Sequence, residues 1–207
     1  MVGEQETRSE DVTGYTIRNS RYLNVTNRCS LRCRFCPKFN GQWTLGEYNM
    51  RLQYEPDVAD LIQAAGNPAS YDEIVFCGMG EATLRLDTVV QVAKALRDRG
   101  AALRLNTSGV ANLVYGRNVA AELARYIPSM SVSLNASDEE TYNLHCRPQL
   151  PGTYSAVLDF IRDARRAGAD VTATAVDGLA GVDVKACERL AGELGVRFRR
   201  RVLDVLI

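Results

Sequence analysis

Three cysteines lie within eight residues of one another, at positions 29, 33 and 36 of the 207-residue chain. They follow an apolar run, Tyr22 to Val25, that has the character of a β-strand. A loop this short can turn Cys29, Cys33 and Cys36 toward one metal centre, and thiolates are the soft ligands that iron–sulfur clusters prefer. Three thiolates leave one iron of a four-iron cluster open to a ligand that is not protein. The spacing therefore favours a [4Fe-4S] site with one open position.

Two other roles for these cysteines have less support. A structural zinc site completes four ligands with a second cysteine or histidine pair, whereas the only histidine is His145 and the cysteines outside the loop, Cys77, Cys146 and Cys187, are scattered. A disulfide framework is typical of small, secreted, cysteine-dense chains, and we identify no secretory signal peptide. We therefore expect reduced cysteines and a cytoplasmic location.

Composition bounds the class of protein. Hydrophobic residues make up 46% of the chain and charged residues 24%, the profile of a soluble globular domain. The 25 basic and 25 acidic residues cancel, so no strong nucleic-acid signal is present. No apolar run approaches the roughly 20 residues that span a bilayer, so we expect no membrane segment.

The order of segments predicts one α/β domain. Residues 1–13 are polar and are expected to form a mobile arm, and residues 14–207 are expected to form the domain, with a short edge strand at 15–17. Strand-like and helix-like segments then alternate, as in βα units of a parallel sheet. The predicted strands are 21–26, 73–77, 103–106, 130–135, 170–176 and 196–204. The predicted helices are 56–65, 87–98, 118–126, one capped by Ser137 with Glu140, 153–167 and 183–194. Right-handed crossovers would curl these units into an open, TIM-like (β/α)6 partial barrel of parallel strands.

Two motifs of the sequence, the cysteine loop and residues 78–81, resemble those of a known family. The C-x3-C-x2-C spacing, with Phe35 before the third cysteine, is similar to the signature of the radical S-adenosylmethionine (SAM) superfamily. Gly78-Met79-Gly80-Glu81 resembles the Gly-Gly-Glu-Pro motif of that family, although Ala82 stands where proline is usual. The resemblance covers about residues 21–203 and is closest to the small radical SAM group linked to TatD-type nucleases. The 7-carboxy-7-deazaguanine synthases and the glycyl-radical activating enzymes are more distant candidates.

The resemblance implies an activity. In this superfamily the open iron binds the amino and carboxylate groups of SAM, and one-electron reduction cleaves SAM to methionine and a 5′-deoxyadenosyl radical that takes hydrogen from a substrate. It also implies an enzyme with one [4Fe-4S] cluster, a small-molecule substrate and an external one-electron reductant of the flavodoxin or ferredoxin type. Fold pattern and resemblance agree, because this superfamily is known for the partial barrel.

Candidate cofactor-binding residues follow the predicted strands, because parallel α/β folds bind ligands at the carboxyl ends of their strands. The resemblance assigns the SAM amino group to the backbone of 78–80 and to Glu81, and it suggests contacts to the ribose or carboxylate farther along. An ordinary βα turn is the alternative at 78–81 and at 106–109, and a surface arginine is the alternative at Arg147. The full set is Gly78, Met79, Gly80, Glu81, Asn106, Ser108, Ser133, Asn135 and Arg147.

The last predicted strand carries alternating arginines. Period two places Arg197, Arg199 and Arg201 on one face, and the opposite, helix-facing side should be apolar. One interpretation is that Arg199 and Arg201 bind a carboxylate or phosphate of the substrate by bidentate hydrogen bonds. The other is that the charges protect an open sheet edge. Both stay open.

Two rival functions belong to other classes. A non-catalytic iron–sulfur protein for electron transfer would need a fourth protein ligand, and no fourth cysteine lies in the loop. A zinc-stabilised interaction module would be colourless. Among the residues outside these motifs, His145 is expected to be packed or solvated, and Cys77 and Cys187 are expected to be small buried hydrophobic residues.

Overall fold

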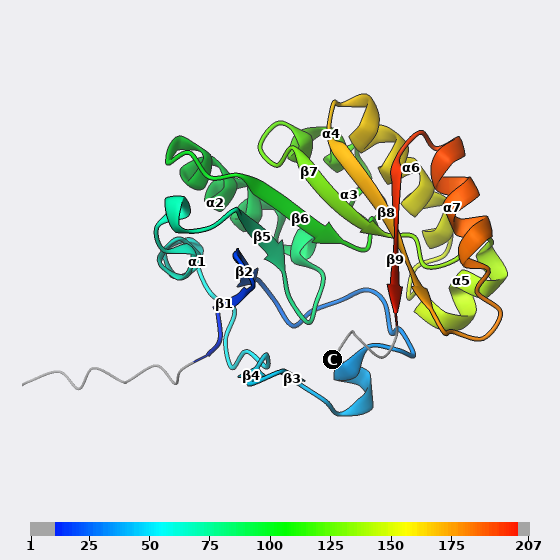
Figure 1. The fold of residues 1–207 in the computed structure, drawn as a ribbon, viewed down its shortest axis with the longest axis horizontal. Coiled ribbons are helices and arrows are strands. Elements are labelled where there is room, and N and C mark those ends of the chain that lie inside the picture. The colour runs from blue at the N-terminus through cyan, green and yellow to red at the C-terminus, as the bar shows by residue number, and fades with distance from the viewer. Residues whose placement is uncertain (1–10, 203–207) are drawn as a thin grey trace, which may run out of the picture.

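The computed structural model describes residues 11–202 of the chain. Within this range the strands form a seven-stranded sheet that curves into an open partial barrel (Figure 1). The strands in spatial order are β1 (Gly14–Ile17), β2 (Ser20–Asn24), β5 (Glu73–Cys77), β6 (Leu103–Thr107), β7 (Ser129–Ser133), β8 (Asp170–Asp177) and β9 (Arg197–Val202). The β1 strand is antiparallel to β2, and the other neighbours are parallel. The predicted partial barrel and its edge strand are confirmed.

The helices cover the outer, convex face of the sheet, as Figure 1 shows for α2, α4, α6 and α7. The α-helices are α1 (Val58–Ala65), α2 (Leu86–Asp98), α3 (Ala111–Tyr115), α4 (Val119–Ala124), α5 (Glu139–Cys146), α6 (Thr153–Arg166) and α7 (Val184–Glu193). Short 3-10 turns lie at Pro37–Asn40, Pro68–Ser70 and Ala82–Arg85. No helix within residues 11–202 is both long enough and apolar enough to cross a membrane.

Alternation along the strands separates the two faces of the sheet. On β6, Leu103 and Leu105 are buried in the core beneath the helices, whereas Arg104 turns to the concave face and bonds Glu73 of β5. The same alternation on β9 packs Phe198 toward the core and leaves the arginines of the other parity on the concave face. The barrel interior is therefore polar, and the main core lies between sheet and helices.

The structure differs from the predicted elements in several places. The strand predicted at 130–135 ends at Ser133, so Asn135 lies in the turn after it, with a left-handed φ of 61°. Asp138, not Ser137, caps α5, because its side chain accepts the amide of Thr141 at 2.8 Å. A two-stranded hairpin, β3 (Thr44–Leu45) and β4 (Tyr48–Asn49), was not predicted, and neither was the single turn of α3. Both are too short to show a hydrophobic period.

The ends of the chain are described only in part. Most of the predicted arm lies outside the described residues, as does the end of the predicted domain, at 203–207. Residues 11–13 lie against the sheet, where the carbonyls of Val12 and Thr13 accept hydrogen bonds from Asn24.

Candidate cluster and cofactor site

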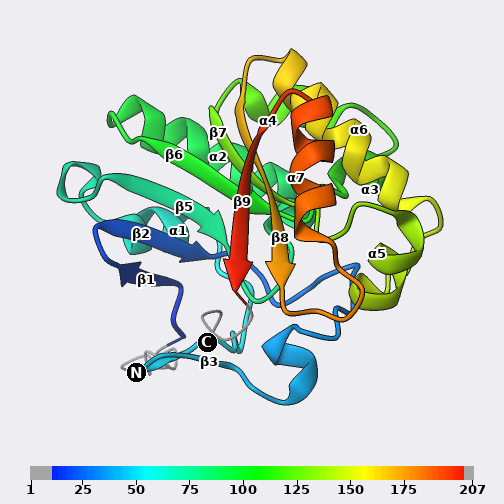
Figure 2. The same ribbon diagram turned by 45° about the vertical axis from the view of Figure 1, so that its right-hand side comes forward.

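The cysteine loop, residues 25–36, leaves β2 at its carboxyl end. Figure 2 shows this segment, in blue, running beyond the arrowheads of β8 and β9, so it lies at the edge where the parallel strands end. Cys29, Cys33 and Cys36 are each half-buried. The fold therefore places the three predicted ligands where parallel α/β folds bind their ligands.

Each of the three sulfurs interacts with a neighbouring protein group. The Leu31 amide donates to the Cys29 sulfur at 3.4 Å, and burial raises the pKa of Cys29 to about 12. The Cys36 sulfur faces backbone amides that begin the first 3-10 turn, and burial raises its pKa as well. The Cys33 thiol interacts with Cys146, which raises the pKa of Cys33 above its ordinary value. Without a metal all three are thiols at neutral pH, so iron must displace their protons.

The thiols are not gathered around a single ion. Within residues 11–202, no three His, Cys, Asp or Glu side chains converge closely enough to hold one metal ion. Tetrahedral zinc would bring its sulfur ligands to within about 4 Å of one another. Three cysteines on one loop are the soft donors that an iron–sulfur cluster prefers.

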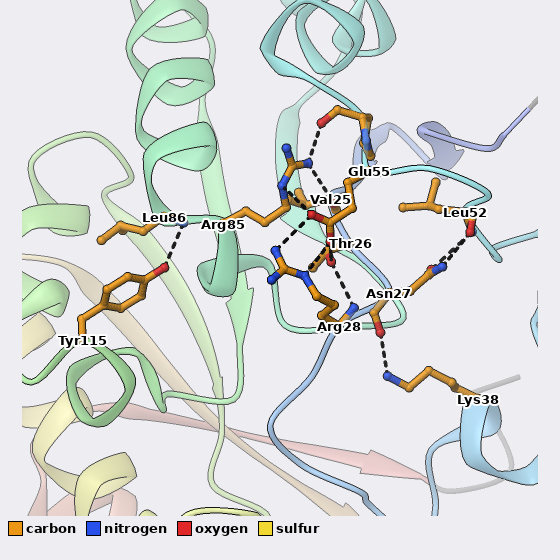
Figure 3. A network of polar contacts seen from close by, with 11 residues as sticks. Val25, Thr26, Asn27, Arg28, Lys38, Leu52, Glu55, Arg85, Leu86 and Tyr115 are labelled. Atoms are coloured by element: carbon orange, nitrogen blue, oxygen red, sulfur yellow. Dashed lines mark hydrogen bonds and ion pairs between the residues drawn. The ribbon is translucent and has the colours of Figure 1, made fainter. Parts of the chain in front are cut away.

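Glu55 fastens the beginning of the cysteine loop (Figure 3). Its carboxylate accepts from the Thr26 hydroxyl at 2.5 Å and from Arg28 at 2.8 and 3.0 Å. Arg85 forms an ion pair with the same carboxylate at 3.3 Å and donates to the Val25 carbonyl at 3.1 Å. Burial alone would raise the pKa of Glu55, but the hydrogen bonds from Arg28 and Thr26 outweigh it and leave that pKa lowered.

Asn27, also in the cysteine loop, bonds the segment that follows the hairpin (Figure 3). Its amide donates to the Leu52 carbonyl at 2.8 Å and accepts from the Leu52 amide at 3.3 Å. The Asn27 carbonyl accepts from Lys38 at 2.8 Å. Sequence analysis missed Thr26, Arg28, Glu55 and Arg85, because no motif links residues whose contact arises only from the folded arrangement.

The loop after β5 lies directly against the cysteine loop. The Gly80 amide donates to the Thr26 carbonyl at 3.0 Å, and the Glu81 amide donates to the Arg28 carbonyl at 2.7 Å. A Cβ atom on Gly80 would overlap the carbonyl oxygens of Arg28 and Thr26. Gly78 has φ of 156° and would carry its Cβ against Thr26 as well. The glycines are therefore required by the close approach of two backbones.

Glu81 is buried and its carboxylate is saturated by the protein. It accepts five hydrogen bonds of 2.5–3.1 Å from the amide and hydroxyl of Thr83, the hydroxyl of Thr107, and the amide and hydroxyl of Ser108. A carboxylate has about four lone-pair positions. In this arrangement Glu81 joins the loops after β5 and β6, and its contact with the SAM amino group stays a prediction. Recognition of the SAM amino group by the backbone of 78–80, including Met79, stays a prediction.

The candidate residues on β6 and its turn have different partners. Ser108 is buried and turned to Glu81, whereas Asn106 lies on the concave face, where its side-chain oxygen accepts from Arg104 at 2.5 Å. Arg104 also forms an ion pair with Glu73 at 2.6 Å, and this hydrogen bond holds the pKa of Glu73 below its usual range. Asn106 therefore faces the barrel interior with its side-chain oxygen bonded to Arg104, whereas Ser108 is bonded to Glu81.

Asn135 connects the end of β7 to β9 and to the cysteines. It adopts a left-handed φ of 61°, accepts a hydrogen bond from Arg201 at 3.0 Å and donates to the Cys146 sulfur at 3.4 Å. Arg199 donates to Ser131 at 3.1 Å. Ser133 shares the concave face with Ser131 and is half-buried. The concave face thus brings Ser133, Asn135, Arg199 and Arg201 to one end of the barrel.

Arg147 is not brought into this group. It caps α5 in a left-handed conformation, with φ of 46°, and its exposed side chain lines a surface hollow of about 370 Å³. None of the other residues around the hollow, Asn143 and 148–152, is a candidate site residue. His145, by contrast, is buried and its Nε2 donates to the Ala180 carbonyl at 2.7 Å, so the packed interpretation is confirmed. Cys77 and Cys187 are buried, as predicted.

Cys146 is the residue that sequence analysis missed beside the loop. It is fully buried and interacts with Cys33, although more than a hundred residues separate the two in the chain. The fold therefore brings a fourth thiol, that of Cys146, beside the three thiols of the cysteine loop.

A sequence model described as the radical SAM superfamily matches residues 23–194 of the chain. The matched range includes the cysteine loop and the loops after β5, β6 and β7. No protein with a curated description matches the chain by sequence.

Several solved structures share this fold. SuiB of Streptococcus suis bound to S-adenosylmethionine matches with a TM-score of 0.65 and 14% identity, over 88% of this chain and 40% of SuiB. HydG, a maturase of the [FeFe]-hydrogenase, matches with 0.63 and 18%, over 89% and 42% of the two chains. TsrM from Kitasatospora setae, with cobalamin and a [4Fe-4S] cluster bound, matches with 0.58 and 15%, over 87% and 36%. The chain spans less than half the length of each.

Proposed function

The chain belongs to the radical SAM superfamily, and we propose that it is an enzyme that cleaves SAM reductively at a [4Fe-4S] cluster. The observation that carries the proposal is the position of Cys29, Cys33 and Cys36, on one half-buried loop at the carboxyl ends of six parallel strands within residues 11–202. Two structures with this fold, SuiB with SAM and TsrM with a [4Fe-4S] cluster, support both cofactors. Membership of the TatD-linked group stays a prediction.

The chain's own residues would hold and orient the cofactors. Cys29, Cys33 and Cys36 would ligate three irons of the cluster, which when bound supplies the electron that breaks SAM into methionine and a 5′-deoxyadenosyl radical. The backbone of 78–80 would contact SAM, and it is held against the cysteine loop by the hydrogen bond from Gly80 to Thr26 and by the bond from Glu81 to Arg28. The polar concave face would receive the substrate and restrict water around it.

An anionic group on the substrate is the finer part of the proposal. Arg199 and Arg201 lie near each other on the concave face, and within residues 11–202 neither forms an ion pair with a carboxylate. Burial and the charge of Arg199 lower the pKa of Arg201, and the buried Nε of Arg201 has no hydrogen-bond partner among the described residues. Two adjacent cations, neither of which forms a direct ion pair with a carboxylate in the described part of the chain, favour an anionic ligand.

The reductant would approach from outside the loop. Arg28, Arg32 and Arg34 are exposed along the cysteine loop. An exposed basic loop complements an acidic one-electron carrier of the flavodoxin or ferredoxin type.

A second candidate function has one observation in its favour. Cys146 lies beside Cys33, and a fourth thiolate would complete a cluster without SAM, as in an electron-transfer protein. The presence of SAM at the cluster separates the two candidates.

The test is an anaerobic assay. The protein is reconstituted with iron and sulfide, reduced with dithionite and mixed with SAM, and 5′-deoxyadenosine is measured by chromatography. We expect product from the wild type and from Cys187→Ala, a matched substitution of a buried cysteine outside the loop, and none from Cys29→Ala. A cluster whose electron paramagnetic resonance spectrum is unchanged by SAM, with no deoxyadenosine, would support electron transfer.

A further inference from the structure

The cysteine loop is paired with a distant segment. Residues 30–34 lie beside residues 145–149, which are the end of α5 and the turn after it, and Leu31 forms an antiparallel β-bridge with Pro148. The hydrogen bonds that join the segments run from Gln149 N to Ser30 O at 3.1 Å, from Arg32 N to Arg147 O at 3.2 Å and from Arg34 N to His145 O at 2.8 Å. These hydrogen bonds hold the cysteine loop against the end of α5 and the turn that follows it.

The amides on both sides of Cys33 bond the last turn of α5, because Arg32 N also donates to the Cys146 carbonyl at 3.1 Å and Arg34 N donates to the His145 carbonyl at 2.8 Å. These two bonds bring the backbone of Cys33 beside that of Cys146, and a disulfide requires Cα atoms about 4.4–6.8 Å apart. The two side chains interact, and this interaction is the largest cause that raises the pKa of Cys33 and lowers the pKa of Cys146.

The surroundings hold the Cys146 sulfur in place. Asn135 donates to it at 3.4 Å, and the Tyr142 side chain lies beside it. The Tyr142 hydroxyl is fully buried and has no well-aligned hydrogen-bond partner within residues 11–202. The Cys29 sulfur instead accepts the Leu31 amide at 3.4 Å.

We propose that Cys33 and Cys146 form a reversible disulfide in the cluster-free protein. The inference deepens the proposed function and rests on it, because Cys33 is a proposed cluster ligand. The oxidant is a low-molecular-weight disulfide such as oxidised glutathione. The thiolate of one cysteine attacks it and releases one glutathione, and the other cysteine then attacks the mixed disulfide and releases the second. Two thiols and one glutathione disulfide become one protein disulfide and two glutathione thiols, so electrons and protons balance.

The disulfide would withdraw one of three ligands from iron. While the Cys33–Cys146 bond exists, Cys33 has no thiolate to offer, and cluster assembly waits for a dithiol or glutathione to reverse the exchange. The exchange would also protect Cys33 from irreversible oxidation. The fraction of chains that bind a cluster would then depend on the ratio of thiols to disulfides in the surrounding solution.

Digestion with trypsin identifies which cysteines are joined by the disulfide. Arginines at 28, 32 and 34 and lysine at 38 place Cys29, Cys33 and Cys36 on three different tryptic peptides, so the mass of a linked peptide identifies its cysteine. The full-length, cluster-free chain is incubated with oxidised glutathione, trapped with iodoacetamide and digested. We expect the Cys33–Cys146 linkage in the wild type and in Cys187→Ala. A linkage of Cys33 to Cys29 or Cys36, or only mixed disulfides with glutathione, would overturn the inference.

Iron content gives the second readout. After oxidised glutathione, the wild type should bind at least several-fold less iron on reconstitution, and dithiothreitol should restore loading. Cys146→Ala, checked for folding by circular dichroism, should load equally with and without the treatment, and an equal loss there would contradict the inference. Deoxyadenosine formation is measured separately on each loaded protein. Product without the linkage would sink this inference alone, whereas the linkage without product or SAM binding would sink the proposed function alone.

Discussion

Glu55 accepts hydrogen bonds from Arg28 through both of its carboxylate oxygens, at 2.8 and 3.0 Å, and Arg28 directly precedes the first cysteine of the loop. The contact fastens the cysteine loop to the segment that leads into α1. Because the Arg28 side chain is largely exposed, we expect its ion pair with Glu55 to position the loop and to contribute little to the free energy of unfolding.

We expect Glu55→Gln to lower cluster occupancy while costing only about 1 kcal/mol of folding free energy, since exposed ion pairs contribute little. Iron per chain after reconstitution and urea unfolding of the cluster-free protein measure the two effects. Glu47→Gln, at an exposed position of the hairpin, is the matched control. Equal iron content in both variants would show that the contact does not position the loop.

Gly80→Ala should displace the cysteine loop. A Cβ atom there overlaps the carbonyl oxygens of Thr26 and Arg28, and overpacking of this kind costs about 1–3 kcal/mol. Gly192→Ala is the control, because nothing lies near its Cβ on α7, and it should be neutral or stabilising by up to about 1 kcal/mol. Thermal unfolding and iron content report both variants. A Gly80→Ala protein as stable as the wild type would refute the close-approach argument.

Glu81→Gln should be strongly destabilising. The buried carboxylate accepts from five donors, and an amide group would turn a donor toward some of them. Hydrogen bonds to charged groups and buried donors left unpaired are each worth about 1–3 kcal/mol, so we expect a loss of about 2–4 kcal/mol in urea unfolding. Glu140→Gln, exposed on α5, should change little. A loss below about 0.5 kcal/mol would mean that Glu81 is not a structural tie.

The ion pair of Glu73 with Arg104 predicts a pH dependence. A hydrogen bond from Arg104 lowers the pKa of Glu73 from its usual 4.5. A carboxyl group whose pKa is lower in the folded state stabilises the protein above its unfolded pKa, and that contribution is lost as the pH falls through the folded pKa. Glu73→Gln should therefore lower the free energy of unfolding at pH 7, and its difference from the wild type should shrink below about pH 4.5. Asp72→Asn, at an exposed neighbouring position, is the matched control for removal of a carboxylate.

Inorganic phosphate tests the anion site without the unknown substrate. A ligand of the folded state raises the unfolding temperature by mass action, so phosphate at constant ionic strength should stabilise the wild type. Arg199→Gln should abolish the shift, whereas Arg197→Gln should keep it, because Arg197 is on the same strand but paired with Asp170. Equal shifts in both variants would point to non-specific binding.

Local signals in the sequence predicted most of the fold. The strand at 73–77 is found at its predicted limits, because a continuous apolar run between turn residues has few alternatives. The capping box of Asp57 with Asp60 begins α1 where it was expected. The cap of α5 was wrong by one residue because Ser137 and Asp138 are both good caps, and only the folded backbone selects between them.

The site was predictable only where its chemistry is local. The spacing of Cys29, Cys33 and Cys36 is visible in the sequence, and so are the glycines after β5. The contact of Cys33 with Cys146 depends on the register of two segments far apart in the chain, and the saturation of Glu81 depends on the arrangement of two loops. Neither leaves a pattern in a single sequence.

The pairing of residues 30–34 with 145–149 also sets an order of events during synthesis. The three loop cysteines leave the ribosome first, but the segment that packs against them follows roughly a hundred residues later, or on the order of 5–20 seconds at about 5–20 residues per second. In that interval the nascent chain presents three exposed thiols on an unfinished loop. A cluster inserted then would meet an open, hydrated site, whereas one inserted later would meet the closed one. Closure of the cysteine loop therefore has to follow synthesis of residues 145–149.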